Sequence, residues 1–271
     1  MAKLPKTITE RFSKNVSKFQ SVLRIAKDRD VNESDTVSIV TDILANVFGY
    51  DKYLEVTSEF AIRGTYCDLA IKVQDKIQFL IEVKAIGIDL KDHHLKQAID
   101  YAANHGVQWV ILTNGEVWKI YKMRFEQPIN YDLVCTFNFI EINLKKEEDK
   151  EKLFIICREG LSKAAREDFH QKVQSVNRFV IGAIVQNEVV VNVIRREVRK
   201  MSPGIKVDNS DVNKLLIEEV LKREVLEGEN AAKAQKQVRK YYSKASKKSN
   251  EKKTVKDESF QKTNEQNSMM H

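Results

Sequence analysis

The stretch between residues 66 and 84 constrains the fold most, because two strand-like runs there agree in only one register. Residues 66–73 and 77–84 alternate apolar and polar side chains, as half-buried strands do. A slip of one residue would turn every apolar side chain to the wrong face. We therefore expect a hairpin whose odd-numbered turn is centred on Asp75. The expected partners are Val73 with Ile77, Ile71 with Phe79, Leu69 with Ile81 and Cys67 with Val83.

This register places two acidic residues face to face. Asp68 lies opposite Glu82, with their Cβ atoms about 5 Å apart, and Lys84 follows on the same face. Two like charges facing each other destabilise a sheet unless something positive lies between them, and a divalent cation suits oxygen ligands. The pattern therefore predicts a metal site. The structural alternative, a surface ion pair of Glu82 with Lys84 worth less than about 1 kcal/mol, leaves the facing acids unexplained.

A preceding hairpin supplies a candidate third acid. Residues 54–62 form another strand-like run, and Gly64-Thr65 suits a two-residue turn with glycine first. Glu59 then lies diagonal to Asp68, either as an additional carboxylate of the site or as an ordinary exposed strand residue. The expected partners in this hairpin are Ile62 with Cys67 and Phe60 with Leu69.

The flanking segments predict an α/β fold with a mixed (α+β) sheet. Helices are indicated by apolar residues at three-to-four spacing, and a tight hairpin turn by Asn114-Gly115. The expected order is a helix, a three-strand meander, a helix and two strands, preceded by a leading amphipathic helix. The predicted elements are helices over about 8–27, from the capping cluster 32–35 to Gly49, and over 90–104, and strands over 107–113 and 116–122.

One face of the helix predicted over 90–104 carries polar residues. Gln97 and Tyr101 are four residues apart and share a face on which His94 also falls. This stripe either lines a cleft over the acids or forms a polar flank beside the apolar residues that cover the sheet. The neighbouring His93 and His94 point about 100° apart on a helix, which is unsuited to chelating one ion.

These segments together resemble a known nuclease domain. Residues 66–71 (Tyr-Cys-Asp-Leu-Ala-Ile), 81–84 (Ile-Glu-Val-Lys) and 97–101 look like the N-terminal domain of type I restriction enzyme R subunits, in the PD-(D/E)xK superfamily. The resemblance covers about residues 35–123, and 108–121 fits its closing hairpin. It implies a restriction-endonuclease-like core.

The resemblance also implies roles for individual residues. Asp68 and Glu82 would be ligands of Mg²⁺, for which Mn²⁺ can substitute, and Lys84 the catalytic lysine. The main-chain carbonyl of Val83 offers another hard oxygen ligand. The family's glutamine–tyrosine motif corresponds to Gln97 and Tyr101. The expected activity is hydrolysis of DNA phosphodiester bonds by a metal-activated water, in restriction or in defence against mobile elements.

The chain also departs from this family. R subunits continue into an ATP-driven motor, whereas no Gly-x-x-x-x-Gly-Lys-Ser/Thr phosphate loop occurs among the nine glycines, so we expect no ATP site. Other restriction or defence subunits acting in trans are candidate partners, and the oligomeric state stays open. The alternative function is an adaptor or nucleic-acid-binding subunit that keeps the fold but cuts poorly.

Composition sets broader limits. The net charge of +7 suits a partner with a phosphate backbone, although a basic surface also serves solubility or an anionic membrane. Three widely spaced cysteines show no zinc-site pattern and indicate a reducing compartment. No stretch approaches the ~18 apolar residues of a membrane helix, and the N-terminus lacks a signal-like apolar region. We expect a cytoplasmic protein without membrane contact.

The residue pattern changes beyond residue 145, where long charged stretches predict helices, including one over 213–226. Pro203-Gly204 predicts a turn between them. Arg195, Arg196, Arg199 and Lys200 either contact phosphates or form a solvated face. The lysine-rich segment 240–256 either adds weak, salt-sensitive affinity or is a solvated tail. The expected division is a leading helix over 1–30, a nuclease-like domain over 31–145, a mainly helical domain over 146–242 and a disordered tail over 243–271.

Overall fold

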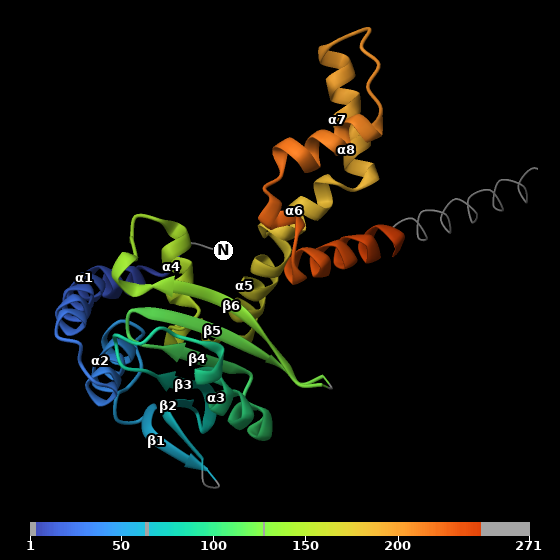
Figure 1. Ribbon diagram of the computed structural model, residues 1–271. Helices are drawn as coiled ribbons and strands as arrows, with labels where there is room; N and C mark the ends of the chain where they lie inside the picture. Colours follow the sequence, from blue (N-terminus) through green and yellow to red (C-terminus); the bar gives the residue numbers. More distant parts are fainter. Residues whose placement is uncertain (1–3, 63–64, 127, 245–271) are drawn as a thin grey trace, which may run out of the picture. The chain divides into compact units, whose positions relative to one another are not determined.

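The computed structural model describes residues 4–62, 65–126 and 128–244 (Figure 1). It divides into two compact units, Met1–Gln171 and Lys172–His271. The first unit thus extends beyond residue 145, where the sequence placed the end of the nuclease-like domain. Of the predicted tail, only residues 243 and 244 are described, within a helix over 229–244. Among the described residues, every helix is too short or too polar to span a lipid bilayer.

A six-stranded mixed sheet forms the centre of the first unit. Its strands lie side by side in chain order, and every neighbouring pair is antiparallel except β3 and β4, which are parallel. A parallel step needs a crossover, which α3 (Asp92–His105) supplies. The strands are β1 (Val56–Ile62), β2 (Thr65–Val73), β3 (Lys76–Val83), β4 (Trp109–Thr113), β5 (Val117–Arg124) and β6 (Asn130–Asn138). The predicted mixed α/β fold and element order are confirmed, and β6 is an additional strand.

Helices cover the sheet, as Figure 1 shows. α1 (Lys6–Asp28) and α2 (Glu33–Asn46) pack against each other, and Phe48, just beyond α2, meets Trp118 of β5 edge-on at 5.4 Å. α3 packs on β2, β3, β4 and β5, where its Leu95 and Ala98 join a buried cluster with Leu80 of β3. Apolar side chains of the strands are thereby removed from water, which is the main stabilisation of such a layered core.

The β2–β3 hairpin reaches the predicted register by a different route. Gln74 and Asp75 both have positive φ, at 51° and 60°, and form a two-residue turn, so Val73 pairs with Lys76 and the predicted partner Ile77 is wrong. A β-bulge then inserts Gln78 as an extra residue in β3. Beyond the bulge Ile71 faces Phe79 and Leu69 faces Ile81, as predicted.

The register predicted for the β1–β2 hairpin is wrong by two residues. Phe60 pairs with Cys67 and Ile62 with Thr65. The expected turn pair Gly64-Thr65 lies partly outside the described residues, which omit 63 and 64. A shift of two residues keeps every side chain on its predicted face, because the side-chain period of a strand is two. The apolar pattern alone therefore could not distinguish the two registers.

The β4–β5 hairpin is confirmed, but its turn is not the tight Asn-Gly turn expected. Thr113 pairs with Trp118, and of the predicted turn pair only Gly115 has positive φ, at 83°. The Asn114 side chain instead donates to the backbone carbonyls of Ile86 and Ile88. This asparagine therefore ties the hairpin to the segment that follows β3.

The second unit is helical. The predicted turn at Pro203-Gly204 is confirmed, with φ of 100° at Gly204. The single helix predicted over 213–226 is wrong, since it is broken into three pieces that follow α7. Before this unit lies α4 (Glu147–Phe154), and α5 (Lys163–Ser175) crosses the boundary between the units. The second unit then contains α6 (Arg178–Val185), α7 (Glu188–Met201), α8 (Asn209–Leu215), the π-helix η3 (Leu216–Val220) and α9 (Arg223–Leu226).

Candidate functional site

Three charged side chains meet where β2 and β3 leave their ladder. Leu69–Ile81 is the last pair of that ladder, so Asp68 and Glu82 are the next residues on the two strands. Asp68 Oδ2 accepts a hydrogen bond of 2.7 Å from the backbone N–H of Val83, and Lys84 Nζ lies 2.7 Å from Glu82 Oε1. Glu82 is buried and only 6% exposed. The structure thus brings Asp68, Glu82 and Lys84 into one acidic centre.

The acidic centre belongs to the face of the sheet that α3 covers. Ala70 and Leu80 belong to the buried cluster formed with α3, and Asp68 and Glu82 lie two residues from them on the same strands. Side chains two residues apart in a strand share a face. The backbone N–H of Lys84 donates to the carbonyl of Thr113 at 2.8 Å. This bond fixes the end of β3 against β4 at the centre.

Burial opposes the charges of both acids. Burial raises the pKa of Asp68, while the Val83 N–H and the charge of Lys84 lower it. Burial also raises the pKa of Glu82, which the hydrogen bond from Lys84 lowers and the charge of Asp68 raises further. In both carboxyls the net pKa is higher than usual. A positive charge near the two carboxylates would therefore favour their ionised forms.

Lys84 is the cation that the centre already contains. Burial lowers the pKa of Lys84, but the hydrogen bond to Glu82 and the charges of Glu82 and Asp68 outweigh burial and raise it above its ordinary value. The ion pair of Glu82 with Lys84, which the sequence offered as the structural alternative, is therefore present. It is largely buried, with side-chain exposures of 8% and 18%, and thus differs from a surface pair.

The donor set fits an ion that keeps much of its water. Among residues 4–62, 65–126 and 128–244, no group of three or more His, Cys, Asp or Glu side chains is arranged to hold a metal. Asp68 and Glu82 offer two carboxylates, and Val83 lies between Glu82 and Lys84. Mg²⁺ is usually bound through one or two carboxylates and several waters, whereas Ca²⁺ needs more protein oxygens. The chemistry of the donors is compatible with Mg²⁺.

Glu33 is a residue of the site that sequence reasoning missed. Its Oε2 lies 3.4 Å from Lys84 Nζ, and its negative charge adds to the rise in pKa of Asp68 and Glu82. The sequence presented it only as part of a capping cluster, and the adjacent Asn32 does cap α2 by accepting from the backbone of Asp35. The only signal was an acid in the first turn of the helix that precedes the strands.

The three polar residues predicted on one face of α3 have different surroundings. Tyr101 is 3% exposed and packs in the buried cluster with Cys67 and Leu80, so it belongs to the apolar layer rather than to an open cleft. His94 is half-buried, and its Nδ1 accepts from the backbone N–H of Lys91. Gln97 lies in α3, but its side chain is outside those that the structure describes.

The pKa of His94 is nevertheless affected by charges of the acidic centre. Its pKa is lowered by burial first and then by the positive charges of His93, Lys84 and Lys91, with an opposing contribution from Glu33. The first turn of α3, which contains His94, therefore lies within electrostatic range of Lys84.

The possible third acid, Glu59, lies in β1 between residues whose partners are Leu69 and Cys67. Its backbone is therefore directly across from Asp68, whereas the sequence placed it diagonally. The Glu59 side chain lies outside the described ones.

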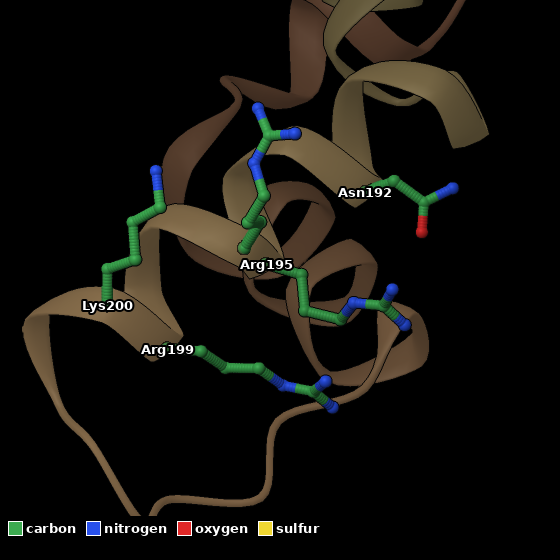
Figure 2. A pocket seen from close by; sticks show the side chains of 5 residues that line it. Asn192, Arg195, Arg199 and Lys200 are labelled. Atoms are coloured by element: carbon green, nitrogen blue, oxygen red, sulfur yellow. The ribbon is translucent and has the colours of Figure 1, made fainter.

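The predicted basic residues lie in the second unit. Arg195, Arg196, Arg199 and Lys200 of α7 line, with Asn192, a hollow of about 470 Å³, and Figure 2 shows this group from close by. The acidic centre belongs to the first unit.

A comparison with protein families agrees with the motifs. Residues 38–135 match the family model of the type I restriction enzyme R protein N terminus, and this segment contains Asp68, Glu82, Lys84, Gln97 and Tyr101. No curated protein matches the chain. A solved structure of the type IIG restriction endonuclease BpuSI matches with 16% identity and a TM-score of 0.31, over 76% of this chain and 29% of that one.

The present chain therefore spans under a third of the restriction endonuclease that it matches. The family match is independent of that comparison and covers the acidic centre and α3 together. Residues 38–135 are similar to the type I restriction enzyme R protein N terminus, which confirms the resemblance predicted from the motifs.

Proposed function

We propose that the protein is a Mg²⁺-dependent endonuclease that hydrolyses phosphodiester bonds of DNA, in restriction or in defence against mobile elements. The observation that carries this proposal is the acidic centre, in which two partly or fully buried carboxylates and a lysine meet within the segment that matches the family. Three charged groups confined at the end of a sheet are costly for folding alone, which favours a functional reason for them.

Asp68 and Glu82 would hold the ion, with the Val83 carbonyl as a further oxygen ligand. When bound, Mg²⁺ would polarise the scissile phosphate and lower the pKa of a bound water. The hydrogen bond from the Val83 N–H to Asp68 fixes the orientation of that carboxylate before any ligand arrives. Such outer contacts determine how well a ligand side chain is positioned.

Lys84 would act on the phosphate or on the attacking water. Its raised pKa keeps it protonated at neutral pH, and its Nζ lies beside Glu82 and Glu33. A fixed ammonium in a partly desolvated site stabilises negative charge that develops on a phosphate oxygen. Without substrate the same ammonium offsets part of the negative charge of the two glutamates.

The glutamine–tyrosine pair would position these groups. Tyr101 packs in the buried cluster with Ala70 and Leu80, two residues from Asp68 and Glu82 along their strands. Gln97 is one helical turn before Tyr101 and falls on the same side of α3. We assign Tyr101 the role of holding α3 on the sheet, and Gln97 a polar contact to substrate or water.

The test is nicking or linearisation of supercoiled plasmid with Mg²⁺, and separately with Mn²⁺. Asp68→Asn and Glu82→Gln should each abolish cleavage, Lys84→Met should reduce it strongly, and EDTA should abolish it in the wild type. Asp75→Asn is the matched control, because that carboxylate is 96% exposed in the turn and asparagine tolerates its positive φ. Cleavage that persists in all three site variants would overturn the assignment.

Two other outcomes would change the proposal rather than refine it. Cleavage of RNA but not DNA would reassign the substrate. Binding without cleavage of any nucleic acid, also after addition of candidate restriction or defence subunits, would favour the adaptor function. These subunits are proposed as partners because the matched family is named for one protein of a restriction enzyme.

A further inference from the structure

We infer that α7 carries a phosphate-binding face that holds the backbone of duplex DNA, independently of the acidic centre. This inference rests on the proposed function in so far as DNA is taken as the substrate. The face consists of Arg195, Arg196, Arg199 and Lys200, which we call the basic face of α7.

Arg196 and Lys200 of the basic face are exposed and are not needed for packing of the helix. On a neighbouring side α7 buries Val191, which is 0% exposed, against Val212 and Leu216 of the following helices. Ile194 and Val207 also pack against this cluster. Apolar contacts therefore contribute to folding of the α7–α8 segment, and the exposed Arg196 and Lys200 need another reason to share one side.

Their partners within the chain are weak. Arg196 and Lys200 both contact Glu197, at 3.4 Å and 2.9 Å, and all three side chains are more than half exposed. Exposed ion pairs contribute little free energy and are readily exchanged. Four cations against two carboxylates, Glu197 and Asp208, leave a local charge of +2.

The two remaining arginines interact with residues between α7 and α8. Arg199 donates to the backbone carbonyl of Val207, which fixes the loop between α7 and α8. The Nε of Arg195 is buried and has no hydrogen-bond partner among the described residues. The pKa of Asp208 is lowered chiefly by the backbone N–H groups of Asp211 and Ser210, and also by the charge of Arg195. Arg196 and Lys200 are therefore the side chains most available to a ligand.

The arrangement favours an extended polyanion. Arg195 and Arg199 lie about one helical turn, ~5.4 Å, apart, and so do Arg196 and Lys200. The cations thus form two short rows along α7, around a hollow that no anionic side chain of the lining fills. Guanidinium groups bind phosphate oxygens through paired hydrogen bonds. A chain of phosphates can engage both rows, whereas one small anion can engage few of these groups.

The experiment measures binding of the full-length protein to a fluorescent DNA duplex of arbitrary sequence in EDTA, across salt concentrations. The double variant Arg196→Gln/Lys200→Gln should lose affinity about tenfold or more and lower the slope of log K against log salt by about two. Lys236→Gln/Arg239→Gln is the matched control, since it removes two exposed charges from the helix over 229–244. It should change neither quantity.

A charge-keeping variant, Arg196→Lys/Lys200→Arg, separates loss of contacts from loss of fold. It should retain the wild-type slope, and the circular dichroism of all variants should agree. An unchanged slope in the glutamine variant, or an equal loss in the control, would refute the inference. Full displacement of DNA by millimolar inorganic phosphate would instead indicate a small-anion site.

Failure of this inference is distinguishable from failure of the proposed function. Binding in EDTA requires no cleavage, so an inactive protein still reports on the basic face. Conversely, plasmid cleavage that survives with an unchanged salt slope in the glutamine variant would leave the nuclease assignment intact and remove α7 from the interface.

Discussion

The acidic centre and the basic face of α7 hold their charges in opposite ways. Glu82 and Lys84 have side-chain exposures of 8% and 18%, whereas Arg196 and Lys200 are 64% and 63% exposed. Buried charges interact strongly because little water screens them, while exposed charges act weakly and additively. The centre is therefore suited to chemistry at one position, and the basic face to salt-dependent affinity over several positions.

The largest expected contrast lies in kinetics. Lys84→Met should lower kcat about 10²–10³-fold, the usual loss for one charged group that stabilises a transition state, with DNA affinity in EDTA unchanged. Arg196→Gln/Lys200→Gln should raise KM and leave kcat at saturating DNA unchanged. Steady-state cleavage of labelled duplex measures both, and Lys76→Met, an exposed lysine at the turn, is the control. A fall in kcat in Arg196→Gln/Lys200→Gln as well as in Lys84→Met would contradict this division between catalysis and binding.

Charge reversal should separate the two regions by stability. Glu82→Lys places a second buried cation beside Lys84 and should cost about 3–5 kcal/mol. Arg196→Glu should change stability by no more than about 0.5 kcal/mol. Both tryptophans, Trp109 and Trp118, belong to the first unit, so their fluorescence in urea reports Glu82→Lys, and circular dichroism reports Arg196→Glu. Equal costs would show that the exposed arginine has a structural role.

Substitutions in the buried apolar clusters should follow the same order, with a larger loss of stability in the first unit than in the second. Leu80→Ala removes a fully buried side chain from the cluster under α3 and should cost about 2–5 kcal/mol. Val191→Ala removes less volume from the small cluster between α7 and α8 and should cost about 1–2.5 kcal/mol. Urea titrations by fluorescence and circular dichroism test the two. A larger loss for Val191→Ala would mean that the second unit depends on this cluster more than its size indicates.

The smallest effect concerns an ion pair that is part of neither site. Arg11 binds both carboxylate oxygens of Glu159 at 2.7 Å. Burial raises the pKa of Glu159, but the hydrogen bonds from Arg11 outweigh it and leave the pKa below its ordinary value. A lowered pKa means that the pair stabilises the fold above the ordinary pKa and loses this contribution as pH falls through the lowered value.

Glu159→Gln should therefore cost about 1 kcal/mol at pH 7, and the difference from wild type should shrink below about pH 4. Urea titrations by tryptophan fluorescence at several pH values measure it. Glu10→Gln, at an exposed pair with Lys6, is the control and should show no such dependence. A difference that grows towards acid pH would contradict the assigned direction.

The centre was predictable because strand periodicity and charge agreed. Alternation over residues 66–84 fixed which side chains share a face, and the two acids could then be placed together. The helix face carrying Gln97 and Tyr101 followed from their spacing alone. These are local or near-local patterns, which a sequence records directly.

The features that escaped prediction depend on tertiary contacts or on backbone geometry. Glu33 reaches Lys84 only because α2 begins beside the end of β3. The positive φ angles of Gln74 and Asp75 are unusual for such residues, so a tight turn there had no strong signal. Burial of Tyr101 required knowing how α3 lies on the sheet. Strand β6 lacks a clean alternation and bulges against β5.

Because of the bulge at Gln78, the geometry of the acidic centre depends on the number of residues in the β2–β3 hairpin. With the two-residue turn and no bulge, Asp68 would lie opposite Ile81, and Glu82 would point to the other side of the sheet. One extra residue restores the parity of the spacing. Loss of a single residue in this hairpin would therefore separate the acids even if every charged side chain were kept. The motif is thus defined by the number of residues between Asp68 and Glu82 as well as by the residue types.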